Sequence, residues 1–389
     1  MRLFSRNMKT KEMSKIAIKI FNILLEIAYI PLKLLPTRRK ITFISRQSNK
    51  ESIDIVMLKD AIRRNIPNCE VATLMKTLDT GVLNKILYGF HMIKQMYHIA
   101  TSQIVILDTY CMTISLLHHK RSLVVIQMWH ALGLMKKAGY CILDKPEGRS
   151  YSLAMAMKLH KNYNVIFASS EKCREAIGQV FGYPINNVYT FPLPRVDLIR
   201  NSEYVEKTKN AIIRKYPILE EKKTIVYAPT YRKNENFMQQ QVEKLILQFP
   251  FEEYNLVCNF HPLSKMKITD KRVVMDTTFS TMELLTVATY VISDYSSIIY
   301  EAAIMEKPII FFAFDLDEYR MDREFFIDYE KEVPGPVCRN VEELIHAIRY
   351  YQCDKELIQS FAEKYVSLSR KNCTDDIVRF LNKLIDSNK

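Results

Sequence analysis

The feature that most constrains this chain is an alternation of short apolar runs with longer helical stretches, which begins at Lys40 and occurs in two successive series. The runs are apolar on both faces, as the central strands of a parallel sheet must be, because helices cover both sides of such a sheet. In the first series we expect strands at 41–45, 71–75, 104–108, 123–127, 165–169 and 188–192, and helices at 52–64, 83–98, 151–160 and 171–181. This pattern predicts a doubly wound α/β domain.

A polar, charged segment at residues 200–223 interrupts the alternation, and the second series follows it. Its expected strands are 224–229, 254–260, 272–276, 289–294 and 308–315, and its expected helices are 239–248, 281–287 and 296–306. A last helical region, 341–387, is expected to pack back across the boundary between the two series. The sequence therefore predicts two Rossmann-like domains, residues 40–205 and 206–389, that face a central cleft.

The N-terminal segment, residues 1–39, is predicted to associate with a membrane. Residues 13–35 are mostly apolar but include four charged side chains, so an amphipathic helix lying in the bilayer interface fits better than a spanning helix. Flanking basic residues would add attraction to anionic lipid: Arg2, Arg6, Lys9, Lys11, Arg38, Arg39 and Lys40. The segment lacks a signal-peptide cleavage site, and an ordinary packed helix is the alternative interpretation.

Composition narrows the functional classes. The net charge of +13 favours anionic partners, namely nucleic acid, phosphorylated metabolites or an acidic membrane surface. The basic residues are dispersed and no nucleic-acid-binding signature occurs, so a nucleic acid is not an expected partner, although a non-catalytic nucleic-acid or lipid-binding protein remains an alternative. Eight cysteines without a CxxC pair argue against a zinc site and a disulfide scaffold, and neither GxGxxG nor GxxxxGK[ST] is present.

Residues able to carry chemistry follow several of the expected strands, where ligands bind in open α/β sheets. His130 follows the run 123–127 and His261 follows the run 254–260, so the two imidazoles come from opposite domains and are expected to form an acid–base pair. The remaining histidines are interpreted as structural or solvated.

Hydroxyl, lysine and arginine side chains near these strand ends suggest an anionic ligand. Asp294 ends an apolar run, and Ser296 and Ser297 begin the next expected helix, where N–H groups favour an anion, although a serine there also acts as a helix cap. Thr230 and Arg232 follow another run; Arg232 would bind phosphate oxygens or form a surface salt bridge. Lys136 and Lys137 would meet acceptor phosphates or form a solvated face.

Five segments between about residues 100 and 345 resemble, in the same order, the CDP-glycerol glycerophosphotransferase family of teichoic acid synthesis: "QMWHALGLMKKAGY", "YAPTYR", "NFHPL", "SDYSSIIYEAAIMEKPIIFFAFDLDEY" and "DYEKEVPGP". The resemblance implies a GT-B-like fold and a peripheral protein on the cytoplasmic face of the cell membrane. The family's usual first motif is W-H-G-T-P-L-K-K; this chain has Ala131, Leu132 and Gly133 at the third to fifth positions and is closest to the primase-like branch.

The resemblance also assigns roles to residues. It implies that His130 and His261 are catalytic and that Trp129, Lys136 and Lys137 bind the acceptor. It implies donor-binding roles for Thr230, Arg232, Asp294, Ser296, Ser297 and, through the ribose hydroxyls, Glu301.

The reaction that the resemblance implies is transfer of an alditol phosphate. A hydroxyl of an undecaprenyl-diphosphate-linked teichoic acid precursor attacks the β-phosphorus of a CDP-alditol, and CMP leaves. His130 would act as the general base and His261 would stabilise or protonate the departing phosphate. CDP-glycerol is the expected donor, and no cofactor or metal is expected. The alternatives are a CDP-ribitol ribitolphosphotransferase and a GT-B nucleotide-sugar glycosyltransferase.

Overall fold

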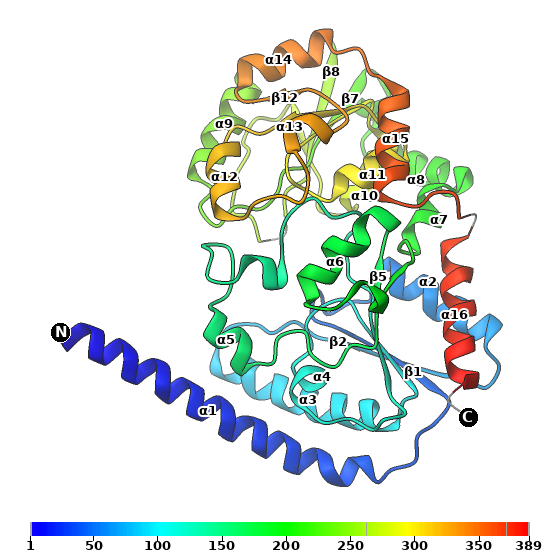
Figure 1. Ribbon diagram of the computed structural model, residues 1–389. Helices are drawn as coiled ribbons and strands as arrows, with labels where there is room; N and C mark the ends of the chain where they lie inside the picture. The colour runs from blue at the N-terminus through cyan, green and yellow to red at the C-terminus, as the bar shows by residue number, and fades with distance from the viewer. Residues whose placement is uncertain (1, 262, 371, 388–389) are drawn as a thin grey trace.

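The computed structural model describes residues 2–261, 263–370 and 372–387, and it shows a long N-terminal helix followed by two α/β domains (Figure 1). Helix α1 spans Arg2–Lys33, and the side chains of its first residues, through position 15, lie outside the description. Within the described residues, no helix combines the length and apolar character needed to cross a bilayer.

The first domain contains a parallel six-stranded sheet with the order β2-β1-β3-β4-β5-β6. All six strands predicted in the first series are present: β1 (Lys40–Ser45), β2 (Glu70–Met75), β3 (Ile104–Leu107), β4 (Val124–Gln127), β5 (Val165–Ala168) and β6 (Val188–Thr190). Its helices are α2 (Ile53–Asn65), α3 (Val82–Thr101), α4 (Met112–Leu116), α5 (Tyr151–Ala156), α6 (Arg174–Phe181) and α7 (Arg195–Ile199). Short 3₁₀ helices cover Gly139–Ile142, Glu171–Cys173 and Ile185–Asn187.

The second domain repeats this design with the strand order β12-β11-β10-β7-β8-β9. Its strands are β7 (Lys223–Tyr227), β8 (Tyr254–Cys258), β9 (Val273–Met275), β10 (Tyr290–Ser293), β11 (Ile309–Phe312) and β12 (Val337–Cys338). Its helices are α8 (Ser202–Lys215), α9 (Asn236–Gln248), α10 (Thr281–Leu284), α11 (Ile298–Ile304), α12 (Leu316–Asp322), α13 (Tyr329–Glu332), α14 (Val341–Tyr350), α15 (Lys355–Tyr365) and α16 (Cys373–Ser387), with 3₁₀ turns at Pro217–Glu220 and Leu285–Val287. The prediction of an α/β fold with two parallel sheets is confirmed.

Several predicted helices end or begin differently from the expectation, among them those at 151–160, 281–287 and 296–306. The helix expected at 151–160 ends at Ala156, because Lys158, His160 and Asn162 adopt left-handed backbone conformations that a right-handed helix excludes. The helix expected at 296–306 begins only at Ile298, so both serines precede it.

The C-terminal helix returns to the first domain, as predicted for the last helical region. In Figure 1, α16 lies beside α2, next to the first sheet. The Phe380 ring packs 5.1 Å from the Phe191 ring, and Arg39 pairs with Asp386 at 3.0 Å. The returning helix therefore fastens the end of the chain to the domain that begins it.

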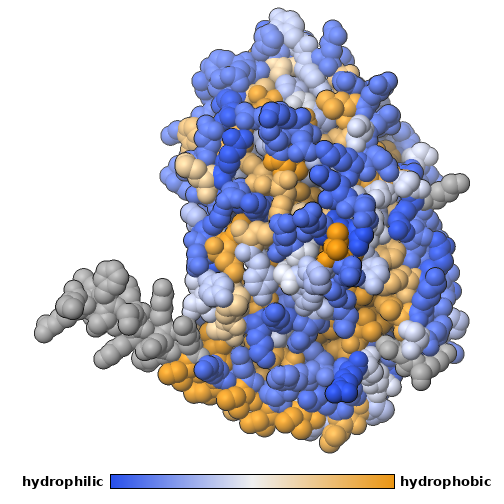
Figure 2. All heavy atoms as spheres, viewed as in Figure 1, coloured by the Kyte–Doolittle hydropathy of each residue, from blue (hydrophilic) through white to orange (hydrophobic). Residues whose placement is uncertain are grey.

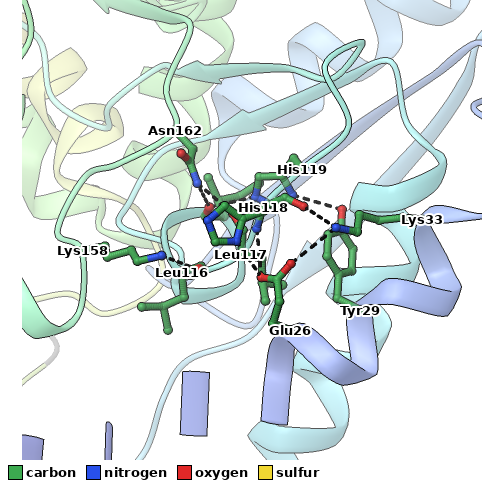
Figure 3. A network of polar contacts seen from close by, with 10 residues as sticks. Glu26, Tyr29, Lys33, Leu116, Leu117, His118, His119, Lys158 and Asn162 are labelled. Atoms are coloured by element: carbon green, nitrogen blue, oxygen red, sulfur yellow. Dashed lines mark hydrogen bonds and ion pairs between the residues drawn. The ribbon is translucent and has the colours of Figure 1, made fainter. Parts of the chain in front are cut away.

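Helix α1 is docked on the first domain through polar contacts with the segment that follows α4 (Figure 3). The Tyr29 hydroxyl donates to Nδ1 of His119 at 3.0 Å, because the other ring nitrogen of His119 faces the Ile114 carbonyl at 2.8 Å. Lys33 donates to the His118 carbonyl at 3.0 Å, and Glu26 accepts from the His118 amide at 3.1 Å. These contacts fix the C-terminal half of α1 on the domain.

Candidate active site

A cavity of about 160 Å³ lies where the loop after β4 meets the β10–α11 segment of the other domain. A second cavity of about 300 Å³ lies among the loops after β7 and β11 and includes Glu147 from the first domain. Arg323 lines both cavities. We call these the His130 cavity and the Arg232 cavity. Both lie at the carboxyl ends of strands, as open α/β sheets require.

His130 lines the first cavity with one ring nitrogen fixed. Its Nδ1 lies 3.0 Å from the Asp108 carbonyl, which can only accept, so Nδ1 carries the proton and Nε2 keeps its lone pair. Burial, together with the neighbouring cations Arg195 and Lys136, lowers the pKa of His130 to about 4. The ring is therefore neutral at pH 7 and has the form that a general base needs.

The loop that carries His130 has an unusual backbone. Trp129 has a φ of 64°, and Gly133 has a φ of 56°. A Cβ atom at Gly133 would lie 2.2 Å from the Tyr300 ring of α11, so this loop and α11 are in direct contact across the seam. The Trp129 ring centroid is 4.1 Å from that of His130, and its buried Nε1 has no hydrogen-bond partner among the described residues.

The two lysines of this loop have different environments. Lys137 pairs with Glu324, and Lys145 joins the same carboxylate. Lys136 instead lines the His130 cavity, and burial followed by the charge of Arg323 lowers the pKa of Lys136 to about 7. Only Lys136 is thus directed at the space beside His130.

Residues 323–326, which we call the strap, join the two domains. The Phe326 amide donates to the Met135 carbonyl at 2.8 Å, and the Lys137 amide donates to the Glu324 carbonyl at 3.1 Å. Lys136 and Phe325 form an antiparallel bridge. The strap therefore adds a short stretch of sheet pairing between the domains and brings Arg323 to the cavities.

Arg232 lies between two carboxylates in the second cavity. It pairs with Asp294 at 2.8 Å and with Asp315 at 2.8 Å, and these carboxylates raise its pKa even though burial opposes the charge. Asp294 also accepts from the Thr230 amide at 2.8 Å, and the buried Thr230 hydroxyl has no partner among the described residues. Asp294 thus holds the loop after β7 in place.

The two serines differ in their surroundings. Ser296 accepts weakly from the Ile298 amide at 3.5 Å, so it performs a local turn contact. Ser297 makes no side-chain cap and lines the His130 cavity.

Glu301 is buried behind that cavity in an ionic cluster. Arg195 pairs with Glu301 at 3.1 Å and with Asp54 of α2, and it donates to the His130 carbonyl at 3.1 Å. Burial raises the pKa of Glu301 although Arg195 opposes this, and Glu301 Oε2 is without a partner among the described side chains. The cluster links both domains to the backbone of His130.

His261 is exposed and does not line either cavity described above. Its ring lies 5.3 Å from that of Tyr231, which lines the Arg232 cavity. Nδ1 of His261 accepts from the Leu263 amide at 3.2 Å, so the neutral ring carries its proton on Nε2. Burial lowers its pKa, which keeps the neutral form at pH 7. His261 is therefore a hydrogen-bond donor at the outer edge of the second cavity.

Known proteins match this chain in sequence and in fold. A family model described as CDP-glycerol:poly(glycerophosphate) glycerophosphotransferase matches residues 28–383. The chain belongs to this family. The family resemblance predicted from the sequence is thereby confirmed, and the protein is a transferase of an alditol phosphate from a CDP-alditol.

Individual glycerophosphotransferase relatives use different alditols. The chain is 26% identical to a teichoic acid ribitol-phosphate primase of Bacillus spizizenii, over 91% of this chain and 94% of the relative. It is 28% identical to a teichoic acid glycerol-phosphate primase of Bacillus subtilis, over 76% and 77%. The solved structure of the wall teichoic acid polymerase TagF superposes with a TM-score of 0.74 at 17% identity, covering 98% of each chain. The fold is thus GT-B-like, as TagF is.

Four residues of this glycerophosphotransferase site were missed from the sequence: Asp54, Arg195, Asp315 and Arg323. Asp54 and Arg195 lie 141 positions apart. Arg195 follows the expected strand at 188–192, but no local pattern shows that it pairs with Asp54 and Glu301. Among the described residues, no group of three or more His, Cys, Asp or Glu side chains is placed to hold a metal ion.

Proposed function

We propose that the His130 cavity is where a hydroxyl of a lipid-linked teichoic acid precursor attacks the β-phosphorus of a CDP-alditol. The observation that carries the proposal is the free Nε2 of His130, which keeps its lone pair because Nδ1 is held by the Asp108 carbonyl. His130 takes the hydroxyl proton as the new P–O bond forms. The bond between the β-phosphorus and the bridging oxygen breaks, and CMP leaves with the electron pair.

The donor residues surround this step. Ser297 and the Thr230 hydroxyl donate to non-bridging phosphate oxygens, and Nε2–H of His261 donates to the departing CMP phosphate. Arg232 and Asp294 act mainly by ordering the loop after β7, because the two carboxylates already occupy the Arg232 guanidinium. Ser296 assists at the same turn. Glu301 orders Arg195 behind the site and does not bind the ribose of the donor. Trp129 and Lys137 contribute to the acceptor side of the loop after β4.

Release of CMP tests the activity. The full-length protein is incubated with CDP-glycerol, CDP-ribitol or a UDP-sugar, together with an undecaprenyl-diphosphate-linked acceptor. Release of CMP with incorporation of the alditol phosphate supports the proposal. Release of UDP without CMP contradicts it and favours a nucleotide-sugar glycosyltransferase.

The transferred group is a glycerol phosphate in this proposal, and a ribitol phosphate is the second candidate. Similarity to a ribitol-phosphate primase over 94% of that protein favours the second candidate. The ratio of kcat/KM for CDP-glycerol to that for CDP-ribitol decides between them.

We also propose that α1 and α3 form one face that lies on the cytoplasmic side of the cell membrane. Exposed apolar side chains gather on both helices, and Figure 2 shows them along the lower edge of the molecule. On α1 they are Ile16, Ile20, Phe21, Ile23, Leu24, Ile27 and Ile30, and on α3 they are Val82, Leu83, Ile86, Leu87, Phe90 and Ile93. Helix α1 faces the domain with Glu26, Tyr29 and Lys33, and Leu25 and Leu32 also pack against the core. The apolar side chains named above stay exposed.

The charges on this face favour a lipid surface over a second protein copy. Helix α3 has no acidic residue, while Lys85 and Lys94 are exposed on it, and Lys19 is exposed on α1. This combination of apolar and basic side chains suits an anionic bilayer interface. One expected contributor is wrong: Lys40 is 2% exposed and donates to the Thr101 hydroxyl, so it faces the interior of the domain.

Binding to vesicles tests the membrane face. Replacement of Leu24 and Phe90 by glutamate should abolish cosedimentation of the full-length protein with vesicles that contain about 30% anionic lipid, because it places charges at the interface. Leu247→Glu is the matched control, because Leu247 is 82% exposed on α9 of the other domain. Equal binding of the double variant and the wild type contradicts the proposal, as does a stable dimer that Leu24→Glu dissociates.

A further inference from the structure

Two cations at the junction of the cavities lack a carboxylate partner among the described residues. Lys136 makes no ion pair or side-chain hydrogen bond there, and its Nζ lies 6.0 Å from the centroid of the Tyr319 ring. Arg323 uses Nε to donate to the Lys137 carbonyl at 3.1 Å, and it pairs with no acid in the same part of the chain. Its two terminal nitrogens are therefore available to a ligand.

Five neighbouring cations along the same boundary are paired with acids. Arg195 has Asp54 and Glu301, and Arg232 has Asp294 and Asp315. Lys137 and Lys145 share Glu324, and Lys233 pairs with Glu147 at 2.9 Å. A charge that is removed from water is costly unless a counter-charge compensates it. Lys136 and Arg323 lack such a counter-charge among the described residues, so an anionic ligand bound between them would supply it.

The charge balance around Lys136 supports this interpretation. Burial is the main cause of its lowered pKa of about 7, and Arg323 and Arg232 lower it further, while Asp294 and Glu147 raise it. The cations thus outweigh the acids at this point. A phosphate bound between Lys136 and Arg323 would relieve their mutual repulsion and favour the charged lysine.

We propose that Arg323 and Lys136 together bind the β-phosphate of the CDP-alditol; this rests on the proposed function. Both side chains line the cavity that contains His130 and Ser297. In the proposed reaction the phosphorus under attack lies within reach of the base, so the β-phosphate belongs in this cavity. Arg323 also lines the Arg232 cavity, and its planar fork suits the oxygens of a diphosphate that passes from one cavity to the other.

This assignment changes the expected role of Lys136 from the acceptor side to the donor side. Lys136 shares its surroundings with Asp294 and Arg232, which are donor-side residues, and not with Lys137, which Glu324 engages. The strap supplies Arg323 from the second domain through its backbone pairing with residues 135–137. The phosphate would therefore be held by one cation from each domain.

Titration of CDP and CMP into the full-length protein tests the proposal, because CDP carries a β-phosphate and CMP does not. Arg323→Gln and Lys136→Met should each weaken CDP binding between about 10-fold and about 100-fold, as expected for the loss of a charge-assisted hydrogen bond. CMP binding should change less than about threefold by the same reasoning. Thermal melting of each variant measures whether the fold is retained.

Two control variants separate a direct contact from indirect effects. Glu324→Gln removes the strap's ion pairs to Lys137 and Lys145 and leaves the Arg323 guanidinium intact. Arg320→Gln removes an exposed cation of α12 that pairs with Glu330, so it reports the effect of net charge alone. Both should bind CDP within about threefold of the wild type.

Several results would overturn the assignment. Unchanged CDP affinity in Arg323→Gln would do so, as would an equal loss of CDP and CMP affinity. An effect confined to the KM of the acceptor would make the ligand an acceptor phosphate. Equal losses of CDP affinity in Glu324→Gln and Arg323→Gln would mean that Arg323 acts by holding the strap in place and not by binding the phosphate. A wild-type protein that neither binds CDP nor releases CMP would instead refute the proposed function, so the two failures are distinguishable.

Discussion

His130 and His261 each follow a parallel strand, β4 in the first domain and β8 in the second, yet their rings are set for opposite tasks. Nδ1 of His130 faces the Asp108 carbonyl, so its Nε2 is a base. Nδ1 of His261 faces the Leu263 amide, so its Nε2–H is a donor. The first ring is enclosed beside a cavity, while the second is exposed at a cavity edge. The position after a strand thus locates a site. The hydrogen-bond partner of Nδ1 then determines whether Nε2 acts as a base or as a donor.

The largest expected effect comes from His130. His130→Ala should lower kcat for CMP release between about 10²-fold and about 10⁴-fold, because the attacking hydroxyl loses its base. Affinity for CDP should be largely retained. Asn at position 130 should not restore activity, because an amide is not a base. His346→Ala, at an exposed position of α14, is the matched control. A loss below about tenfold would remove His130 from the role of base.

Substitutions of Arg195 test whether its hydrogen bond to the His130 carbonyl positions the His130 ring and so sets it apart from the His261 ring. Arg195→Met leaves the carboxylates of Asp54 and Glu301 buried and uncompensated, so we expect a loss of about 3–5 kcal/mol in the free energy of unfolding. Urea denaturation measures it. Arg195→Lys should recover part of the stability but less of kcat, because a lysine cannot reach both acids and the His130 carbonyl together. Equal recovery of both quantities would argue against a positioning role.

His261 should respond to substitution in the opposite way from His130. His261→Ala removes a hydrogen bond to a charged leaving group, which predicts a loss between about 10-fold and about 100-fold in kcat. His261→Asn should regain part of that loss, because an amide N–H can also donate. Single-turnover release of CMP measures both variants. If Asn at position 261 is no better than Ala, the donor role of His261 fails.

The smallest expected effect is a pH dependence of kcat/KM. The base must be unprotonated, so kcat/KM rises with pH through the pKa of His130, about 4. Lys136 must be charged to hold the phosphate, so kcat/KM falls as the pH rises through the pKa of Lys136, about 7. Lys136→Arg should remove the alkaline decline, because arginine stays charged. An alkaline limb that persists in this variant would exclude Lys136 as its source.

Much of the fold follows from local sequence patterns. The strands predicted from apolar runs are present in both sheets, because a strand buried on two faces leaves a continuous apolar signal. Strand β12 gave no such signal, since it contains only Val337 and Cys338. The order of strands within each sheet depends on contacts between distant segments, which no local pattern contains.

The site was predictable where it coincides with strand ends. His130, Thr230, Arg232 and Ser297 follow apolar runs and line or adjoin the cavities. Arg323 was not predictable, because it follows a short helix and reaches the cavity only through the pairing of the strap with the other domain. Arg195 was not predictable for a similar reason, because its partners Asp54 and Glu301 lie on α2 and α11, far from it in the sequence.

Gly133 has a consequence for how this branch of the family can vary. The usual family motif has proline at this position, and the proline ring fixes φ near −65°, whereas Gly133 has a φ of 56°. Glycine in place of proline at position 133 therefore changes the course of the backbone as well as the side chain. A proline introduced at position 133 would have to redirect the loop, and any larger side chain would act as a wedge against Tyr300 and force the two halves of the enzyme apart.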